Sequence, residues 1–177
     1  LLRRGRVAAV LPRIVHDGEM PRLMSGLTDL RALGVKDALV GNLGLLKPAR
    51  DAGFRIRGDF GLNIFNSASM NVARSLELAS ATVSFEMTLP QIRDVSKAVP
   101  SEILVYGRTP LMLTENCLIR GRTGQCTCHL APAKLTDKTG AEFPIIRDGS
   151  SCRSVLLNGK KLNLLDRQDD LSKLGLW

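Results

Sequence analysis

Apolar and polar stretches alternate along the chain between residues 7 and 106. Short apolar runs rich in β-branched residues are typical of buried strands, and apolar residues three to four positions apart are typical of helices. The expected strands are residues 7–15, 38–40, 55–60, 81–87 and 102–106, and the expected helices are residues 21–33, 45–52, 67–79 and 88–99. Such alternation predicts right-handed βαβ units and a parallel sheet, and therefore a protein of the α/β class.

Five βα units are too few for a closed (β/α)₈ barrel, which needs eight strands. We therefore expect residues 1–113 to form either a partial, TIM-barrel-like domain or an open parallel sheet. The best candidate for a buried strand is residues 103–106, because four large apolar side chains follow one another there.

The pattern changes after residue 113. A polar stretch rich in Cys, Arg and Gly leads to a predicted hairpin, in which residues 133–136 and 142–146 flank a turn at residues 137–140. Residues 154–157 and 161–164 flank Asn158-Gly159, a strong signal for a tight hairpin. Residues 114–177 are therefore predicted to form a second domain, a small antiparallel lobe.

All four cysteines lie in or just before this predicted lobe's hairpins: Cys117, Cys126, Cys128 and Cys152. Four thiolates suit tetrahedral zinc or a 4Fe–4S cluster, and we favour zinc. A metal would supply folding free energy to a lobe that has little core of its own. The alternative is four unrelated thiols, because cysteine is often buried as a small apolar residue.

A second constellation of polar residues follows the predicted strands. Ligands of parallel α/β folds bind at the carboxyl ends of the strands, so these side chains are candidates for a site. The candidate catalytic residues are Glu86, Arg108, Asp59 and Asn63, and the candidate substrate-binding residues are Arg57, Asn66, Asn42 and Glu115. Glu86 lies inside a predicted apolar strand, where a buried carboxylate needs a partner such as Arg57 or Arg108. The alternative is a set of structural ion pairs and turn-forming residues.

Charge and composition restrict the partners. The net charge of +8 favours an anionic partner such as nucleic acid, although a solvated basic surface explains it equally well. Aromatic residues make up 4% of the chain, which argues against a base-stacking platform. There is no signal peptide and no apolar run long enough to cross a bilayer, so we expect a cytoplasmic protein with reduced thiols.

Several segments together resemble the collagenase-like peptidases, the thirty-second of the unassigned peptidase families. The segment from Asp59 to Ser67 resembles the family's D-x-x-L-N-x-x-N-S motif, and Ser84-Phe85-Glu86-Met87 is similar to its S-x-E-L segment. Tyr106-Gly107-Arg108-Thr109-Pro110-Leu111-Met112 resembles H-G-R-x-P-L-M, with Tyr in place of His. Thr114-Glu115-Asn116-Cys117, Phe143-Pro144-Ile145 and Cys152-Arg153 resemble segments C-terminal to that motif in longer members.

The resemblance implies a TIM-barrel-like catalytic domain and two competing activities. One is hydrolysis of peptides, and the other is oxygen-independent hydroxylation of RNA bases (tRNA or rRNA) or of a quinone precursor with an iron–sulfur cluster held by four cysteines. The family's own cysteine pair belongs to a barrel half that precedes this chain, so the four cysteines here are expected to form a second site. We therefore expect a C-terminal fragment that pairs with the missing half or with another copy, because an incomplete sheet exposes its edges. A third hypothesis is a binding module with structural zinc.

Overall fold

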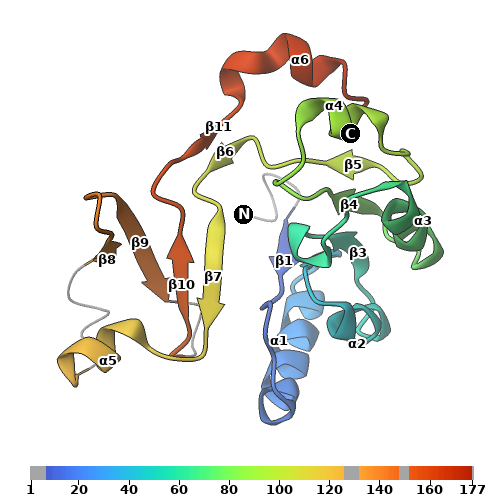
Figure 1. Ribbon diagram of the computed structural model, residues 1–177. Helices are drawn as coiled ribbons and strands as arrows, with labels where there is room; N and C mark the ends of the chain where they lie inside the picture. The colour runs from blue at the N-terminus through green and yellow to red at the C-terminus, as the bar shows by residue number, and fades with distance from the viewer. Residues whose placement is uncertain (1–6, 126–131, 148–151, 177) are drawn as a thin grey trace. The chain divides into compact units, whose positions relative to one another are not determined.

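A computed structural model describes residues 7–125, 132–147 and 152–176 (Figure 1). The chain divides into two compact units. We call residues 1–104 with 167–177 the parallel unit, and residues 105–166 the antiparallel unit. None of the described helices is both long and apolar enough to cross a membrane.

The parallel unit contains a five-stranded parallel sheet whose strands follow one another in sequence order. The strands are β1 (Ala8–Val10), β2 (Asp37–Val40), β3 (Arg55–Gly58), β4 (Ser80–Thr82) and β5 (Ser101–Glu102). The helices that connect them are α1 (Met20–Ala32), α2 (Leu46–Asp51), α3 (Ser67–Ser75) and α4 (Leu89–Asp94), and α6 (Gln168–Ser172) adds the chain's last helix. The predicted α/β class, with strands and helices in alternation, is confirmed.

One face of this sheet carries the apolar core. Ala38, Val40, Ile56 and Ala81 are fully buried and belong to one cluster with residues of α1 to α4. Because alternate residues of a strand point to opposite faces, their neighbours share the other face. These neighbours are mostly polar: Asp37, Arg55, Arg57, Ser80, Thr82 and Glu102.

Local sequence signals set the helix boundaries. The Thr88 backbone N–H donates to Gln91 Oε1 at 2.8 Å, as expected from the capping box at the start of α4. Gly34 follows α1 with φ +88°, a conformation that favours glycine. Asn66 caps α3, because its side chain accepts the backbone N–H of Ser69 at 2.9 Å.

Three predicted strands are wrong in their extent. The strand predicted over residues 7–15 ends at Val10. The strand predicted over residues 81–87 ends at Thr82, and a bridge between Val83 and Ile64 continues it by one residue. The strand predicted over residues 102–106 ends at Glu102. The apolar residues after Glu102 instead carry the chain across the boundary between the two units, which falls after Leu104.

The antiparallel unit contains two sheets. The larger has the order β7 (Pro110–Thr114), β10 (Ser154–Leu157), β9 (Glu142–Arg147), β8 (Ala133–Thr136). The smaller pairs β6 (Tyr106–Gly107) with β11 (Leu162–Asn163), and α5 (Leu118–Thr123) follows β7. The predicted domain boundary after residue 113 thus lies inside β7.

The predicted hairpin of β8 and β9 is confirmed, with Lys134 opposite Pro144 and Leu135 opposite Phe143. The predicted pairing of residues 154–157 with 161–164 is wrong. Strand β10 already has β7 and β9 on its two sides, so β11 pairs with β6 instead. The turn at Asn158 is held by its backbone N–H, which donates to the Thr109 carbonyl at 2.8 Å.

Candidate functional site

The carboxyl ends of β2 and β3 approach each other closely in the parallel unit. A Cβ atom at Gly61 would lie 2.5 Å from the Gly41 carbonyl oxygen, well inside van der Waals contact. Glycine at position 61 therefore lets the two loops touch through their backbones. Because sites of parallel α/β folds form at this edge, the polar residues beside the contact are the leading candidates.

Asp59 stands at this edge, directly after β3. Its Oδ1 accepts the backbone N–H of Phe60 at 2.8 Å and thereby caps the short helix Phe60–Leu62. Burial is the main cause that raises the pKa of this carboxyl above its ordinary value, and the negative charge of Glu102 adds to it. The Phe60 hydrogen bond and the positive charge of Arg13 act against that rise. A carboxyl group of raised pKa at the carboxyl edge is suited to proton transfer.

Arg57 and Glu102 form an ion pair on the polar face of the same sheet. Arg57 Nη2 lies 2.6 Å from Glu102 Oε2, and Arg57 Nε lies 3.2 Å from both Glu102 Oε1 and Ser80 Oγ. The pair joins β3 to β5 across β4, with both side chains about a quarter exposed. Bidentate pairing fixes the guanidinium and the carboxylate in one plane, which makes both groups rigid.

An aromatic ring, that of Phe60, directly follows Asp59 and packs against the ring of Phe85. The ring centroids of Phe60 and Phe85 are 5.4 Å apart in a tilted arrangement. The Arg13 guanidinium lies 5.1 Å from the Phe60 ring centroid, and Asn42 Nδ2 donates to the Arg13 carbonyl at 3.0 Å. This edge therefore combines a carboxyl group, a cation and a partly exposed apolar surface.

The three predicted asparagines have structural contacts that match the alternative interpretation as turn formers. Asn42 Oδ1 accepts the Gly44 backbone N–H at 2.8 Å and caps the short helix Leu43–Leu45. Asn63 has a left-handed backbone with φ 54°, which asparagine tolerates better than most residues. Asn66 caps α3. Of the three, Asn42 and Asn63 lie at the carboxyl edge next to Asp59, and their part in binding stays a prediction.

Glu86 differs from its prediction. It is exposed and lies in a turn beyond the end of β4, so it is not a buried carboxylate inside a strand. Its backbone N–H donates to Ser84 Oγ at 3.3 Å, and the ion pair predicted for its side chain is instead made between Arg57 and Glu102. The buried-carboxylate argument for Glu86 is therefore wrong.

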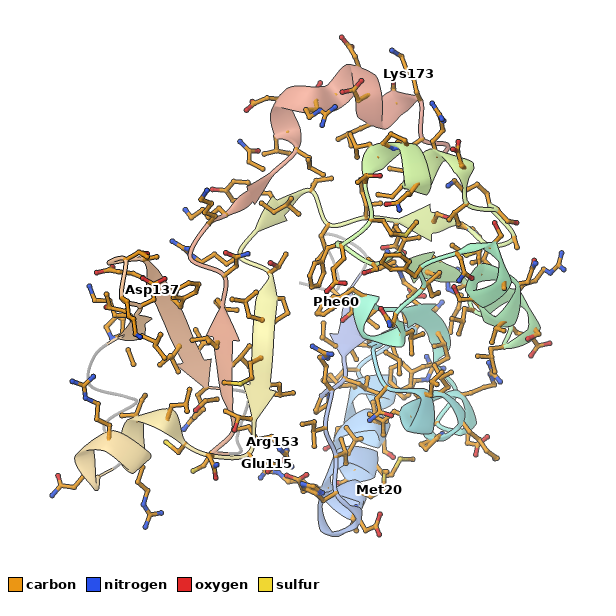
Figure 2. All side chains as sticks on the ribbon, viewed as in Figure 1. Met20, Phe60, Glu115, Asp137, Arg153 and Lys173 are labelled. Carbon is orange, nitrogen blue, oxygen red and sulfur yellow. The ribbon has the colours of Figure 1, made fainter. Side chains whose placement is uncertain are left out.

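Arg108 and Glu115 belong to the antiparallel unit and have partners there. Arg108 Nη1 donates to the Asn158 carbonyl at 2.8 Å and to the Gly159 carbonyl, so it holds the turn between β10 and β11. Glu115 Oε1 lies 2.6 Å from Arg153 Nε, an ion pair whose arginine side chain is 5% exposed (Figure 2). These contacts stabilise the antiparallel unit.

Two of the four predicted metal ligands can be placed. Cys117 is half-buried, Cys152 is exposed, and both are free thiols that line one open cavity of about 840 Å³ together with Arg120 and Arg122. Cys126 and Cys128 lie outside the described residues. The described residues alone contain no cluster of three or more metal-binding side chains. The four-cysteine metal site therefore stays a prediction.

Sequence reasoning missed Arg13 and Glu102. Arg13 comes three residues after β1, in a stretch where the pattern predicts a longer strand. Glu102 begins what was predicted to be an apolar strand, so the argument about a buried carboxylate was applied to Glu86 instead. The alternation of Arg55, Ile56 and Arg57 in β3 was the available signal, because it places two arginines on one face of the sheet and so calls for acidic partners there.

The whole chain can now be compared with known families. The family model of peptidase family U32 matches residues 2–177, so the chain belongs to this family. This confirms the resemblance drawn from its motifs. No curated protein and no solved structure matched the chain.

Proposed function

We propose that this chain is a peptide hydrolase whose proton-transfer group is Asp59. The observation that carries the proposal is the raised pKa of a partly buried carboxyl at the carboxyl edge of a parallel sheet. Membership of a peptidase family supports hydrolysis of peptides as the reaction class. The partial, TIM-barrel-like architecture is part of the proposal, supported by five parallel strands in sequence order.

In the proposed reaction, Asp59 accepts a proton from the water that attacks the peptide carbonyl and then passes it to the departing amine nitrogen. A pKa raised by burial makes the carboxylate a stronger base for the first step and a usable acid for the second. The negative charge that develops on the carbonyl oxygen is stabilised by Arg13, which already interacts electrostatically with Asp59. Arg57, held by Glu102, anchors the substrate on the polar face.

A second candidate is an iron–sulfur-dependent hydroxylase of tRNA or rRNA bases. The cavity that Cys117 and Cys152 share with Arg120 and Arg122 favours it, because thiolates hold clusters and arginines bind phosphates. The proposed ligands are Cys117, Cys126, Cys128 and Cys152, and a bound cluster would supply electron transfer. With zinc in place of the cluster, the same ligands would make the antiparallel unit a structural binding module.

The proposal also includes a binding partner at the exposed edges of the parallel sheet. The edges β1 and β5 of the parallel sheet have no neighbouring strand among the described residues, and Val10 at one edge is 71% exposed. We propose that they pair with a missing barrel half or with another copy of the chain. Light scattering at micromolar concentration tests this, and a monodisperse monomer would contradict self-association.

The hydrolase proposal is tested with the variant Asp59→Asn on unfolded collagen and casein. We expect activity to fall by roughly 10²- to 10⁴-fold, the usual contribution of a proton-transfer group. The matched control is Asp51→Asn, because Asp51 is an exposed aspartate of the same unit that pairs only weakly with Lys47. Equal activity of the two variants would refute the assignment of Asp59.

The alternatives are separated by two measurements on the same protein. Iron content with visible absorption and salt-dependent RNA binding would favour the hydroxylase. About one zinc per chain without hydrolysis would favour the binding module.

A further inference from the structure

The ends of strands β7 and β10 bring two cysteines together in the antiparallel unit. Thr114 is the register partner of Ser154, and this pair is the last of the ladder. Cys117 follows three residues after Thr114, and Cys152 lies two residues before Ser154. The two thiols are 35 positions apart in sequence but lie just beyond the same end of the ladder.

Two contacts hold the chain on both sides of these cysteines. Between the cysteines and the ladder, Arg153 Nε lies 2.6 Å from Glu115 Oε1. On the other side of Cys117, the Leu118 backbone N–H donates to Ser154 Oγ at 3.3 Å. These two contacts hold β7 and β10 together at the end of their ladder. The two thiols therefore cannot move far apart without breaking one of these contacts.

The side chains also share their surroundings. Cys117 and Cys152 line the cavity of about 840 Å³ and also a second, smaller one floored by Ile119, Ile145 and Ile146. Arg120 and Arg122 line the larger cavity, and Cys117 Sγ accepts the Arg120 backbone N–H at 3.4 Å. Both thiols therefore line the same open cavity, where an external disulfide can reach them.

We infer that Cys117 and Cys152 form a redox-active pair that closes to a disulfide under mild oxidation. The exposed Cys152 thiolate attacks an external disulfide such as oxidised glutathione and releases one thiol. The half-buried Cys117 thiolate then attacks the Cys152 sulfur of the mixed disulfide and releases the second thiol. Two protein thiols are thereby oxidised, and one glutathione disulfide is reduced to two thiols.

The inference goes beyond the proposed hydrolase and does not depend on it. The disulfide would close the open end of the β7–β10 ladder.

The test uses the full chain, reduced, treated with a chelator and then equilibrated with oxidised glutathione. Peptide mapping by mass spectrometry under non-reducing conditions should find Cys117 joined to Cys152. In Cys117→Ser the glutathione should stay on Cys152 as a mixed disulfide, and in Cys152→Ser the disulfide should be lost completely. The matched controls, Cys126→Ser and Cys128→Ser, should still form it.

Each other outcome overturns the inference. Pairing of Cys117 or Cys152 with Cys126 or Cys128 as the main product would show that a different pair closes. Full retention of four free thiols in the wild-type chain would show that the geometry does not allow closure. The mapping reads the thiols directly, so a chain that hydrolyses nothing and binds no metal still gives a clear answer.

Discussion

The two units bury their apolar side chains to very different degrees. Every apolar side chain that is fully buried among the described residues belongs to the parallel unit, from Leu11 to Leu174. In the antiparallel unit the fully buried residues are Arg153 and Ser154, while Leu111 is 52% and Ile146 is 49% exposed. A unit of 62 residues with so little buried apolar surface needs another source of stability, such as a metal, a disulfide or a partner.

The same difference separates the chemistry of the units. The parallel unit can keep Asp59 partly desolvated because a core of aliphatic side chains fixes its loops. The antiparallel unit relies on polar contacts, such as Glu115 with Arg153 and Arg108 with the Asn158 carbonyl. Proton-transfer chemistry is therefore expected in the first unit, and thiol or metal chemistry in the second.

Truncation of one leucine in each unit tests this contrast and should give the largest effect. Leu27→Ala in α1 should lower the free energy of unfolding by about 2–5 kcal/mol, because Leu27 is 2% exposed and the lost side chain leaves a cavity. Leu156→Ala in β10 should cost less, about 1–2 kcal/mol, because this residue is only half-buried. Chemical denaturation with unit-resolved hydrogen exchange measures both. Equal costs would mean that the antiparallel unit is as well packed as the parallel unit.

A smaller change in the free energy of unfolding is expected where the loops after β2 and β3 touch. Gly61→Ala should destabilise the parallel unit by about 1–3 kcal/mol, because the new Cβ would lie 2.5 Å from the Gly41 carbonyl oxygen and force the loops apart. The matched control is Gly26→Ala in α1, where nothing lies within 4 Å of an added Cβ. This control should stabilise the chain by about 0.5–1 kcal/mol, since alanine favours a helix. Thermal unfolding of both variants decides the matter, and a neutral Gly61→Ala would contradict the close approach.

The pH dependence of stability should have opposite signs at one aspartate of each unit. Burial raises the pKa of Asp59 in the folded chain. The unfolded chain therefore loses this proton at a lower pH than the folded chain. As a result, the free energy of unfolding falls as pH rises from the unfolded pKa of Asp59 to its raised folded pKa. Hydrogen bonds from the Thr139 side chain and the Ala141 backbone lower the pKa of Asp137, which therefore adds stability above its unfolded pKa and loses it on acidification. At pH 7, Asp59→Asn should raise the unfolding midpoint slightly and Asp137→Asn should lower it.

Both differences should vanish at a pH below both the folded and unfolded pKa values, where the carboxyls are protonated in the folded and unfolded chain alike. Unfolding curves across the acidic range provide the measurement. A fall in stability for Asp59→Asn at pH 7 would show that the carboxylate is stabilised rather than desolvated.

The sequence predicted much of the fold where local and tertiary signals agree. The alternation of apolar runs and the turn at residues 137–140 both led to elements that the structure contains. The predictions were wrong where the pairing of strands distant in sequence determines the structure. Residues 103–105 are apolar enough for a strand, yet they connect the two units, and Asn158-Gly159 forms a turn without joining β10 to β11.

The candidate site was harder to predict than the fold. Asp59 and Arg57 were found because they end a strand of clear pattern, whereas Glu102 becomes a partner of Arg57 only through the order of β3, β4 and β5. Glu86 was selected because its strand was drawn too long. Because the predicted strand extends four residues beyond the Val83 bridge, Glu86 was predicted to be buried, although it lies in an exposed turn.

The pairing of β6 with β11 also has an evolutionary meaning. Tyr106 lies opposite Asn163, so the chain enters and leaves the antiparallel unit at adjacent positions. A segment whose two ends meet can be gained or lost by a single genetic event without cutting the host domain. Residues 105–166 thus have the form of a transplantable module, and a short linker in their place would join Leu104 to Arg167.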